Sequence, residues 1–509
     1  MNPDIYDIID QLFVYSSDKP LLYTRPVFWL LFAAIMGLYS IFYKKNRIRN
    51  IYLLAISFFL YYKTNGAFLF LLIFSSVFNY LAGYSIEESK RAVTKKTWVA
   101  FSIAINLLIL AYFKYAYFFT ESFNRIFNTH LEVVNWLILW ENHIFGTSFD
   151  AMQILLPVGI SFYTFQAISY IVDVYRQRVE VVKNIFDFSF YLAFFPQLVA
   201  GPIVRASTFI PQLYQKYRLT KAEFGHAVFL ILKGLIKKIV FADFIAVNFI
   251  DRVFSSPTSY SGIENVLAVY GYSLQIYADF SGYTDIAIGL ALLMGFKLPV
   301  NFNEPYKAIN LTNFWRQWHI SLSLWLRDYL YIPLGGNRKG KIRMHLNLLT
   351  TMILGGLWHG AHLRFLIWGA IHGVGLVVDK LWNRLSKKIV PPSKILKSLG
   401  VILTFNLVTF AWIFFRAEGQ NAINQMLFQI SHHFEFSILL NVFTGYTIPL
   451  TVMILGFIFM FLPFGLKEKV RGAFIKSPAW IKLIAVVITV LILYQAASSG
   501  LQAFIYFRF

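Results

Sequence analysis

Long apolar stretches recur along the entire chain, and they restrict its possible folds more than any other feature. A helix that crosses a bilayer needs roughly 20 apolar residues. The stretches lie at 27–43, 51–62 with 66–84, 98–119, 153–175, 185–203, 224–250, 263–296, 312–333, 344–358, 363–383, 398–415, 446–466 and 480–503. Hydrophobic residues make up 58% of the 509 positions and charged residues 14%, against about 45–50% and 25% in soluble proteins. We therefore predict an all-α polytopic membrane protein with about eleven transmembrane helices.

Three of the stretches contain residues that disfavour a simple membrane span. Pro, Gly, Arg or His occur in 153–175, 185–203 and 312–333. Backbone that leaves the helical conformation at membrane depth is tolerated only where protein or water covers it. These stretches are therefore predicted to be re-entrant or broken helices around an internal cavity.

The net charge of +21 comes from 46 Lys and Arg against 25 Asp and Glu. In a soluble protein it would suggest a nucleic-acid partner, but here the basic residues gather between apolar stretches, as in cytoplasmic loops. The basic segments are 44–49, 90–96, 384–397 and 467–476. With all four in the cytoplasm, 51–62 and 66–84 form a hairpin of two crossings, and the acidic segment 119–150 and the C-terminus lie outside. We expect membrane lipid around the chain and no nucleic acid.

The chain has no cysteine, which excludes a disulfide framework, a thiolate nucleophile and a cysteine zinc site. A metal would depend on His and carboxylates. His359 and His362 have the spacing of two ligands on a helix, and His372 follows, but no further ligand has a suitable spacing. We expect neither a metal nor a bound cofactor.

Ionisable residues are unusually dense between 279 and 372, inside apolar stretches where a charge is costly. Asp279 and Asp285 share one stretch. Their spacing places them on different faces of an ideal helix, and Gly282 between them is a candidate helix break. A buried hydrogen-bond network around a helix break explains these carboxylates better than an acid and base pair does.

Two histidines stand beside tryptophans in separate stretches. Arg316 and His319 are three residues apart, so a helix would turn both toward one cavity. His359 lies between Gly355, Gly356 and Gly360, where backbone or ligand can approach closely. Imidazole is a usable proton acceptor at neutral pH because its ordinary pKa is about 6.5. The alternative is that both are core histidines with satisfied hydrogen bonds.

Two further motifs each allow two interpretations. The turn at 335–341 carries Arg338 and Lys339, which either attract the phosphates of a coenzyme or mark a cytoplasmic loop. The C-terminal segment 504–509 contains Tyr506. It belongs either to an interfacial aromatic belt or to a tail whose phenol accepts an acyl group with help from a base such as His359.

Several strings of the sequence together resemble the membrane-bound O-acyltransferase (MBOAT) family, in its bacterial branch typified by alginate O-acetyltransferase. They lie at 156–166, 194–202, 277–285, 301–306, 314–336 and 358–360. The resemblance implies a ring of transmembrane helices around a central funnel. It also implies a catalytic core at 151–420, preceded by helices in 1–150 and followed by helices and an extracytoplasmic tail in 421–509.

The family has two signature positions, and they match His319 and His359. The second is regarded as catalytic, so the resemblance assigns the base to His359 and a supporting role to His319. We expect further support or substrate contacts from the residues around them: Trp315, Arg316, Trp318, Trp358, Asp279 and Asp285. The tail is similar to a motif in which the Tyr carries the acyl group, which favours Tyr506 as an acceptor.

The resemblance implies transfer of acetyl from cytosolic acetyl-CoA across the bacterial inner membrane to a cell-surface polysaccharide. A periplasmic SGNH-hydrolase-like O-acetyltransferase is the expected partner that completes the transfer. A lipid or protein acyltransferase and a teichoic-acid D-alanyl transferase share the fold and stay open. A transporter would be expected to show an internal repeat, and none is recognisable.

Overall fold

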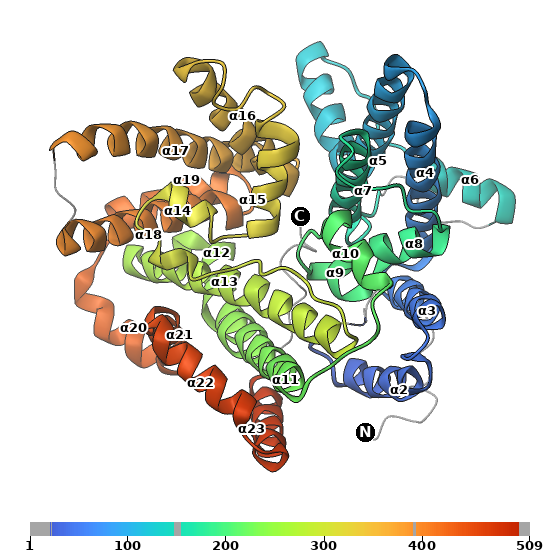
Figure 1. Ribbon diagram of the computed structural model, residues 1–509. Coiled ribbons are helices and arrows are strands. Elements are labelled where there is room, and N and C mark those ends of the chain that lie inside the picture. Colours follow the sequence, from blue (N-terminus) through green and yellow to red (C-terminus); the bar gives the residue numbers. More distant parts are fainter. Residues whose placement is uncertain (1–20, 22, 147–153, 390–392, 498–509) are drawn as a thin grey trace.

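The computed structural model describes residues 21, 23–146, 154–389 and 393–497, and within these residues the regular structure is helical, without strands (Figure 1). This confirms the predicted all-α fold. The first part contains α2 (Pro26–Phe42), α3 (Asn46–Asn65), α4 (Leu69–Glu88), α5 (Ala92–Phe127), α6 (Trp136–Phe145), α7 (Ile160–Tyr175), α8 (Ile185–Ala193), α9 (Phe195–Ala200) and α10 (Ala206–Leu213). These helices form one side of the molecule, on the right in Figure 1.

The other side contains the remaining α- and π-helices. They are α11 (Lys221–Ile236), the π-helices η2 (Lys237–Phe244) and η3 (Ala246–Ile250), α12 (Asp251–Ser255), α13 (Gly262–Leu293), α14 (Leu311–Trp315), α15 (Ile320–Leu326), the π-helix η6 (Arg327–Tyr331), α16 (Lys341–His359), α17 (Leu363–Ile389), α18 (Lys394–Arg416), α19 (Gln420–His432), α20 (Leu439–Gly445), α21 (Thr447–Phe461), α22 (Phe464–Lys476) and α23 (Ala479–Ala497). In Figure 1, α13 runs through the middle, with α14 to α18 above it and α20 to α23 below.

Several helices are long and apolar enough to cross a membrane. In the described part of the chain there are 5 such helices, or up to 6 if a pair bent by 101° counts as one span. They are Asn46–Glu88, Ala92–Phe127, Leu363–Leu385, Lys394–Arg416 and Ala479–Ala496, with Phe436–Gly445 and Thr447–Phe461 as the bent pair. The chain is therefore a multi-pass helical membrane protein, and the count of about eleven stays a prediction.

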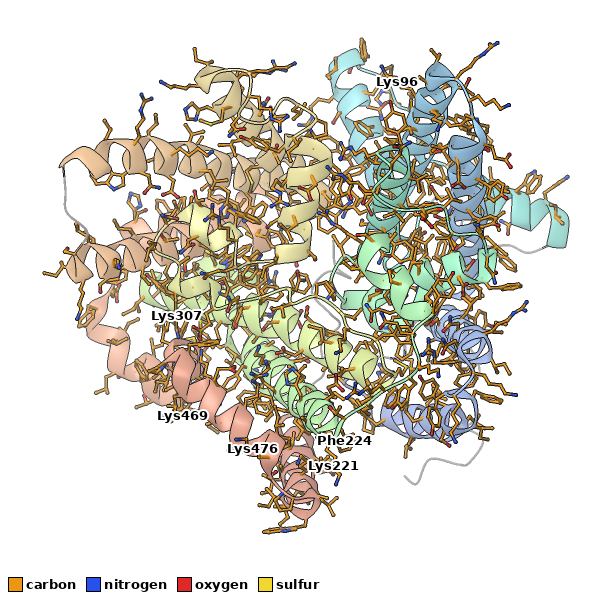
Figure 2. All side chains as sticks on the ribbon, viewed as in Figure 1. Lys96, Lys221, Phe224, Lys307, Lys469 and Lys476 are labelled. Carbon is orange, nitrogen blue, oxygen red and sulfur yellow. The ribbon has the colours of Figure 1, made fainter. Side chains whose placement is uncertain are left out.

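The predicted hairpin at 51–62 and 66–84 is wrong. Gly66, with φ 58°, introduces only the short 3-10 turn η1 (Gly66–Phe68), and α3 and α4 continue as one helical run, Asn46–Glu88. The even number of crossings expected between the first two basic segments thus has no basis in the structure. Figure 2 shows Lys96 at one edge of the molecule and Lys469 and Lys476 at another. The sidedness of the loops stays a prediction.

The predicted interruptions are confirmed in two stretches. Helix α8 stops at Ala193 and α9 restarts after a sharp turn at Phe194, and α14 and α15 are separated by residues 316–319. Gly282, by contrast, does not break α13. A Cβ at Gly282 would lie 2.8 Å from the carbonyl oxygen of Gly234, so the glycine permits close packing of α11 on α13.

Close packing of α16 on α17 sets the position of the site. A Cβ at Gly356 would lie 2.2 Å from the carbonyl oxygen of Phe365, and one at Gly369 would lie 2.4 Å from that of Met352. Real Cβ atoms do not approach so closely, so both positions require glycine. The absence of side chains lets the two backbones meet, and it places the end of α16 directly against α17.

Candidate active site

His359 is the last residue of α16, and two side chains of α5 hold the helix end that presents it. Lys114 Nζ donates to the carbonyl oxygen of Trp358 at 2.6 Å, and the Tyr115 hydroxyl donates to that of Leu357 at 2.9 Å. The last carbonyls of a helix have no intrahelical donor, and a cation there also complements the helix dipole. These bonds fix the backbone immediately before His359.

Aromatic rings surround the His359 imidazole, whose residue is 4% exposed. Ring centroids lie 4.9 Å away for Trp358, 5.2 Å for Trp368 and 5.1 Å for Phe415. Such a setting keeps bulk water away from the ring.

His319 occupies a backbone conformation that few side chains adopt. Its φ of 42° and ψ of 55° are left-handed, and the residue stands at the start of α15. Asn301 stabilises this turn: its carbonyl oxygen accepts from Ile320 N at 2.9 Å, and its side-chain Oδ1 accepts from Ser321 N at 3.1 Å and Ser321 Oγ at 2.9 Å. Strained backbone held in this way is characteristic of functional sites.

Asn301 also orients the imidazole of His319. Nδ1 of His319 lies 3.2 Å from Asn301 Oδ1. Because that oxygen already accepts from Ser321 N, the amide orientation is set, and an amide oxygen can only accept. His319 therefore carries its proton on Nδ1 and keeps its lone pair on Nε2.

The structure brings His319 and His359 together on either side of Trp358. Both rings lie near that of Trp358, with centroid distances of 6.3 Å for His319 and 4.9 Å for His359. Trp358 also stacks on Phe165 of α7, with centroids 5.3 Å apart. Two buried histidines from separate segments therefore lie in one aromatic cluster, where they are candidates for general acid–base chemistry.

A third histidine, His372 of α17, lies in the same aromatic cluster and is 0% exposed. Its ring centroid is 4.8 Å from Trp368, 5.2 Å from Trp315 and 6.4 Å from Trp412. Across the described ranges no three His, Asp or Glu side chains come together as a metal site. His362, the other histidine weighed as a ligand, is exposed.

The two aspartates that the sequence singles out lie in ion pairs apart from the histidines. Asp285 accepts from Lys233 at 3.0 Å and from Lys237 at 2.8 Å. Asp279 pairs with Lys238, which also donates to Asp243 at 2.7 Å. These contacts explain the burial of both carboxylates without a substrate, in agreement with the alternative of a buried polar network.

Arg316 does not share a cavity with His319, contrary to the expectation from their spacing. Helix α14 ends at Trp315, and the left-handed turn at His319 breaks the periodicity between the two residues. Arg316 is exposed, and its charge acts on Lys380 of α17. Arg338 and Lys339 are exposed in the glycine turn before α16.

The tryptophans divide between two roles. Trp315 and Trp358 contact the histidine rings directly, at 5.2 Å from His372 and 4.9 Å from His359. Trp318 packs against Trp412, with its centroid 5.1 Å from that of Trp412. Tyr506 lies outside the described residues.

Two residues of the site were absent from the candidates chosen on sequence. Lys114 is a lone cation in the apolar stretch 98–119, and the general rule that such residues are functional would have found it. Asn301 opens one of the strings that carry the family resemblance, but no local pattern links it to a histidine 18 residues later.

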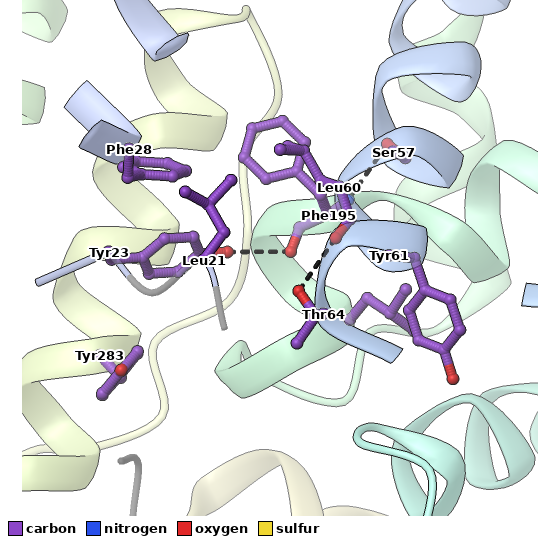
Figure 3. Close-up of a pocket in the computed structure, with 10 residues that line it drawn as sticks. Leu21, Tyr23, Phe28, Ser57, Leu60, Tyr61, Thr64, Phe195 and Tyr283 are labelled. Carbon is purple, nitrogen blue, oxygen red and sulfur yellow. Dashed lines mark hydrogen bonds between the residues drawn. The ribbon is translucent and has the colours of Figure 1, made fainter. Parts of the chain in front are cut away.

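A small pocket lies elsewhere, between α3, α9 and α13 (Figure 3). Its walls include Tyr61, Tyr283 and Leu198. Tyr23 donates to the carbonyl oxygen of Phe195 at 3.0 Å on one side of it. None of the three buried histidines is among its lining residues, so this pocket is separate from the histidine cluster.

Comparison with known proteins gives an independent finding. The model of the membrane-bound O-acyltransferase family matches residues 178–419, a range that contains His319, His359 and His372. The chain is 40% identical to the probable alginate O-acetylase AlgI of Pseudomonas aeruginosa over 408 residues, which cover 80% of this chain and 72% of that protein.

Two further relatives are named for other activities. The peptidoglycan O-acetyltransferase of Helicobacter pylori is 36% identical over 438 residues, with 80% of this chain and 79% of that protein covered. The teichoic acid D-alanyltransferase of Streptococcus thermophilus is 31% identical over 287 residues, covering 51% and 68%. Identity of this extent, added to the buried histidine pair, shows that the chain belongs to the membrane-bound O-acyltransferase family and is an acyltransferase.

Proposed function

We propose that this protein takes an acetyl group from cytosolic acetyl-CoA and delivers it across the bacterial inner membrane for O-acetylation of a cell-surface or secreted polysaccharide. The observation that carries this proposal is the proximity of both His319 and His359 to Trp358, inside a buried aromatic cluster. The relatives named as alginate and peptidoglycan O-acetylating enzymes support the choice of acetyl and of a polymer. They favour it over D-alanyl transfer because their similarity extends over more of the chain.

In the proposed step, an acceptor hydroxyl attacks the carbonyl carbon of the thioester. Its proton moves to His359 as the new C–O bond forms, the C–S bond breaks, and the same proton passes to the departing sulfur to give CoA thiol. His359 thus acts first as base and then as acid. His319 has a supporting role in this proposal and positions the reacting groups near His359. Positioning of this kind lowers the barrier by removing orientational freedom from the reaction.

Several finer assignments belong to this proposal. Residues 151–420 form the catalytic core, and Arg338 and Lys339 in their exposed turn attract the phosphates of CoA. The C-terminus lies outside the cytoplasm, where Tyr506 is the first acceptor. A periplasmic SGNH-hydrolase-like O-acetyltransferase then completes the transfer to the polymer.

The test is to incubate the purified protein with acetyl-CoA and to measure both CoA release and peptide masses. Wild type, His359→Ala and Tyr506→Phe are compared. We expect His359→Ala to reduce CoA release by about 10²- to 10⁴-fold, and Tyr506→Phe to abolish an acetyl adduct on the C-terminal peptide. CoA release without an adduct removes Tyr506 from the mechanism. No release, even with the periplasmic partner added, contradicts the acetyl-CoA reaction itself.

A further inference from the structure

Three side chains beside His359 form a triangle of mutually contacting rings whose polar atoms lack partners. The ring centroids are 5.8 Å apart for Trp315 and Trp368, 4.8 Å for Trp368 and His372, and 5.2 Å for Trp315 and His372. Trp315 is 9% exposed, Trp368 1% and His372 0%. Within the described residues, nothing accepts a hydrogen bond from either indole N–H, and neither ring nitrogen of His372 has a partner.

Such a group is unusual inside a protein. A buried polar atom without a partner keeps its full desolvation cost, and most buried polar atoms in native structures are bonded to protein or to ordered water. Here four such atoms belong to three side chains in contact. The rings themselves are well packed, so their position follows from apolar contacts, whereas their polar atoms remain available.

The chemistry of these atoms limits what can bind there. Each indole offers one donor and no acceptor, and a neutral imidazole offers one donor and one acceptor. Donors therefore outnumber acceptors, which suits an oxygen with two lone pairs. Indole N–H groups cannot ligate a cation, so a metal is a poor match, and the aromatic walls suit a ligand whose other atoms are apolar.

We propose that Trp315, Trp368 and His372 form the binding site for the carbonyl oxygen of the acyl thioester, beside His359. This inference rests on the proposed function, since it assigns the place of the acyl group in that reaction. Trp368 contacts both His359 and His372, at 5.2 and 4.8 Å, so the site adjoins the base directly.

The same donors strengthen their interaction as the reaction proceeds. When the acceptor oxygen bonds to the carbonyl carbon, the electron pair of the C=O bond moves onto the carbonyl oxygen. When the C–S bond breaks, the pair returns and the sulfur leaves with its own electrons and the proton. Fixed donors that face the developing negative charge in a dry site lower the barrier, and loss of one typically costs about 10²-fold in kcat or more.

The chain offers a matched control in Trp412. It belongs to the same cluster, with its ring stacked on Trp368 at 5.8 Å, but its Nε1 already donates to the Tyr306 hydroxyl at 3.0 Å. Trp315→Phe and Trp368→Phe remove donors that have no protein partner, whereas Trp412→Phe removes a donor that has one. Trp315→Phe and Trp368→Phe should therefore lower activity more than stability, whereas Trp412→Phe should lower stability more than activity.

The first experiment measures acetyl-CoA turnover and thermal unfolding of the three variants in detergent. We expect Trp315→Phe and Trp368→Phe each to lower kcat about 10²-fold, with unfolding closer to wild type than in the control. Trp412→Phe should unfold earlier and keep kcat per folded molecule within about threefold. Equal kcat values in all three variants would overturn the proposal.

The second experiment measures binding without chemistry. One probe is the ketone analogue of acetyl-CoA in which CH2 replaces the thioester sulfur, and the other is S-ethyl-CoA, which lacks the carbonyl oxygen. We expect the ketone to bind wild type about tenfold more tightly or better, and Trp315→Phe, Trp368→Phe and His372→Phe to reduce this preference. Turnover by wild type without a carbonyl preference overturns this inference alone. Failure of wild type both to turn over acetyl-CoA and to bind the ketone overturns the proposed function as well.

Discussion

Two groups of polar residues inside this protein differ in how completely they are bonded. Between α11, η2 and α13, every charge named has an opposite charge in contact, as in the pairs of Asp285 with Lys233 and Lys237 at 3.0 and 2.8 Å. In the aromatic cluster of α14, α16 and α17, the polar atoms of Trp315, Trp368 and His372 have no partner among the described residues.

This difference separates structural from functional polarity in a membrane protein. A buried charge is costly, and an ion pair with good geometry accounts for its presence without any ligand. A buried neutral group that lacks a partner is not accounted for by the fold. A high density of ionisable residues in the sequence therefore indicates roughly where the active site lies. Whether their polar atoms have hydrogen-bond or ion-pair partners then distinguishes candidate site residues from residues that only stabilise the fold.

The largest expected effect comes from breaking the fully bonded region. Lys238→Met leaves Asp243 and Asp279 close together without their shared cation. We expect a loss of about 3–5 kcal/mol in the free energy of unfolding, or failure to accumulate in the membrane. The measurement is thermal unfolding and expression level in detergent-solubilised membranes.

Asp279→Asn is the matched comparison. It removes one of two carboxylates and leaves the bond of Lys238 to Asp243 at 2.7 Å. We expect a clearly smaller loss of stability than for Lys238→Met, and a kcat per folded molecule like that of wild type. A selective loss of kcat in Asp279→Asn, with stability preserved, would return Asp279 to the reaction and remove the contrast between the regions.

The next effect concerns Asn301 as a positioning residue for His319. Asn301→Ala removes the acceptor that orients the imidazole and holds the left-handed turn. We expect kcat for CoA release to fall about 10²-fold with KM little changed, since misplacement of a reacting group has costs of this size. Ser321→Ala is the control because it removes a hydroxyl that donates to the same oxygen and accepts from Ile203 N at 3.0 Å, but it leaves the contact of Asn301 with His319. Equal kcat losses in both variants would mean that general loosening, and not the orientation of His319, is responsible.

A smaller effect is expected at the end of α16. Lys114→Met removes the ammonium that donates to the Trp358 carbonyl, while Tyr115→Phe removes the neighbouring neutral donor to Leu357. Bonds from a charged donor are worth about twice those from a neutral one. We expect a kcat loss of about tenfold for Lys114→Met and less than threefold for Tyr115→Phe, from steady-state CoA release. The reverse order would show that the charge beside His359 is unimportant.

The sequence was sufficient for features that depend on local pattern. Long apolar stretches predicted the helical membrane fold, and the position of His319 and His359 beside tryptophans in such stretches predicted the pair that the structure brings together. Hydrogen bonds between side chains of one helix and the backbone of another could not be predicted in this way. Lys114 reaches the end of α16 from α5, and their separation in sequence is 244 residues.

The wrong expectations share one assumption, namely that local sequence alone decides where a helix continues and where it ends. Arg316 and His319 have helical spacing, but Asn301 holds His319 in a left-handed turn and directs Arg316 to the surface. Gly282 is a helix breaker by intrinsic propensity, yet it permits α11 to pack on α13. In both cases a contact between residues distant in sequence decides whether the helix is interrupted.

The smallest expected effect lies where α11 begins, at a charge that is bonded but largely in contact with water. Glu223 accepts from Thr220 N at 2.9 Å and pairs with Lys297 at 2.9 Å, and the Lys297 side chain is 73% exposed. The Thr220 backbone bond is the first cause that lowers the pKa of Glu223 from 4.5 to about 2. The folded state thus favours the carboxylate, so its contribution is present above pH 4.5 and is lost as the pH falls toward 2.

We expect Glu223→Gln to lower stability by less than about 1 kcal/mol at neutral pH, with the difference from wild type vanishing near pH 2 in thermal unfolding. Since Lys238→Met and Glu223→Gln both remove one partner of an ion pair, a similar loss in the two would show that burial does not set the cost, and the contrast between the two buried regions would lose its physical basis.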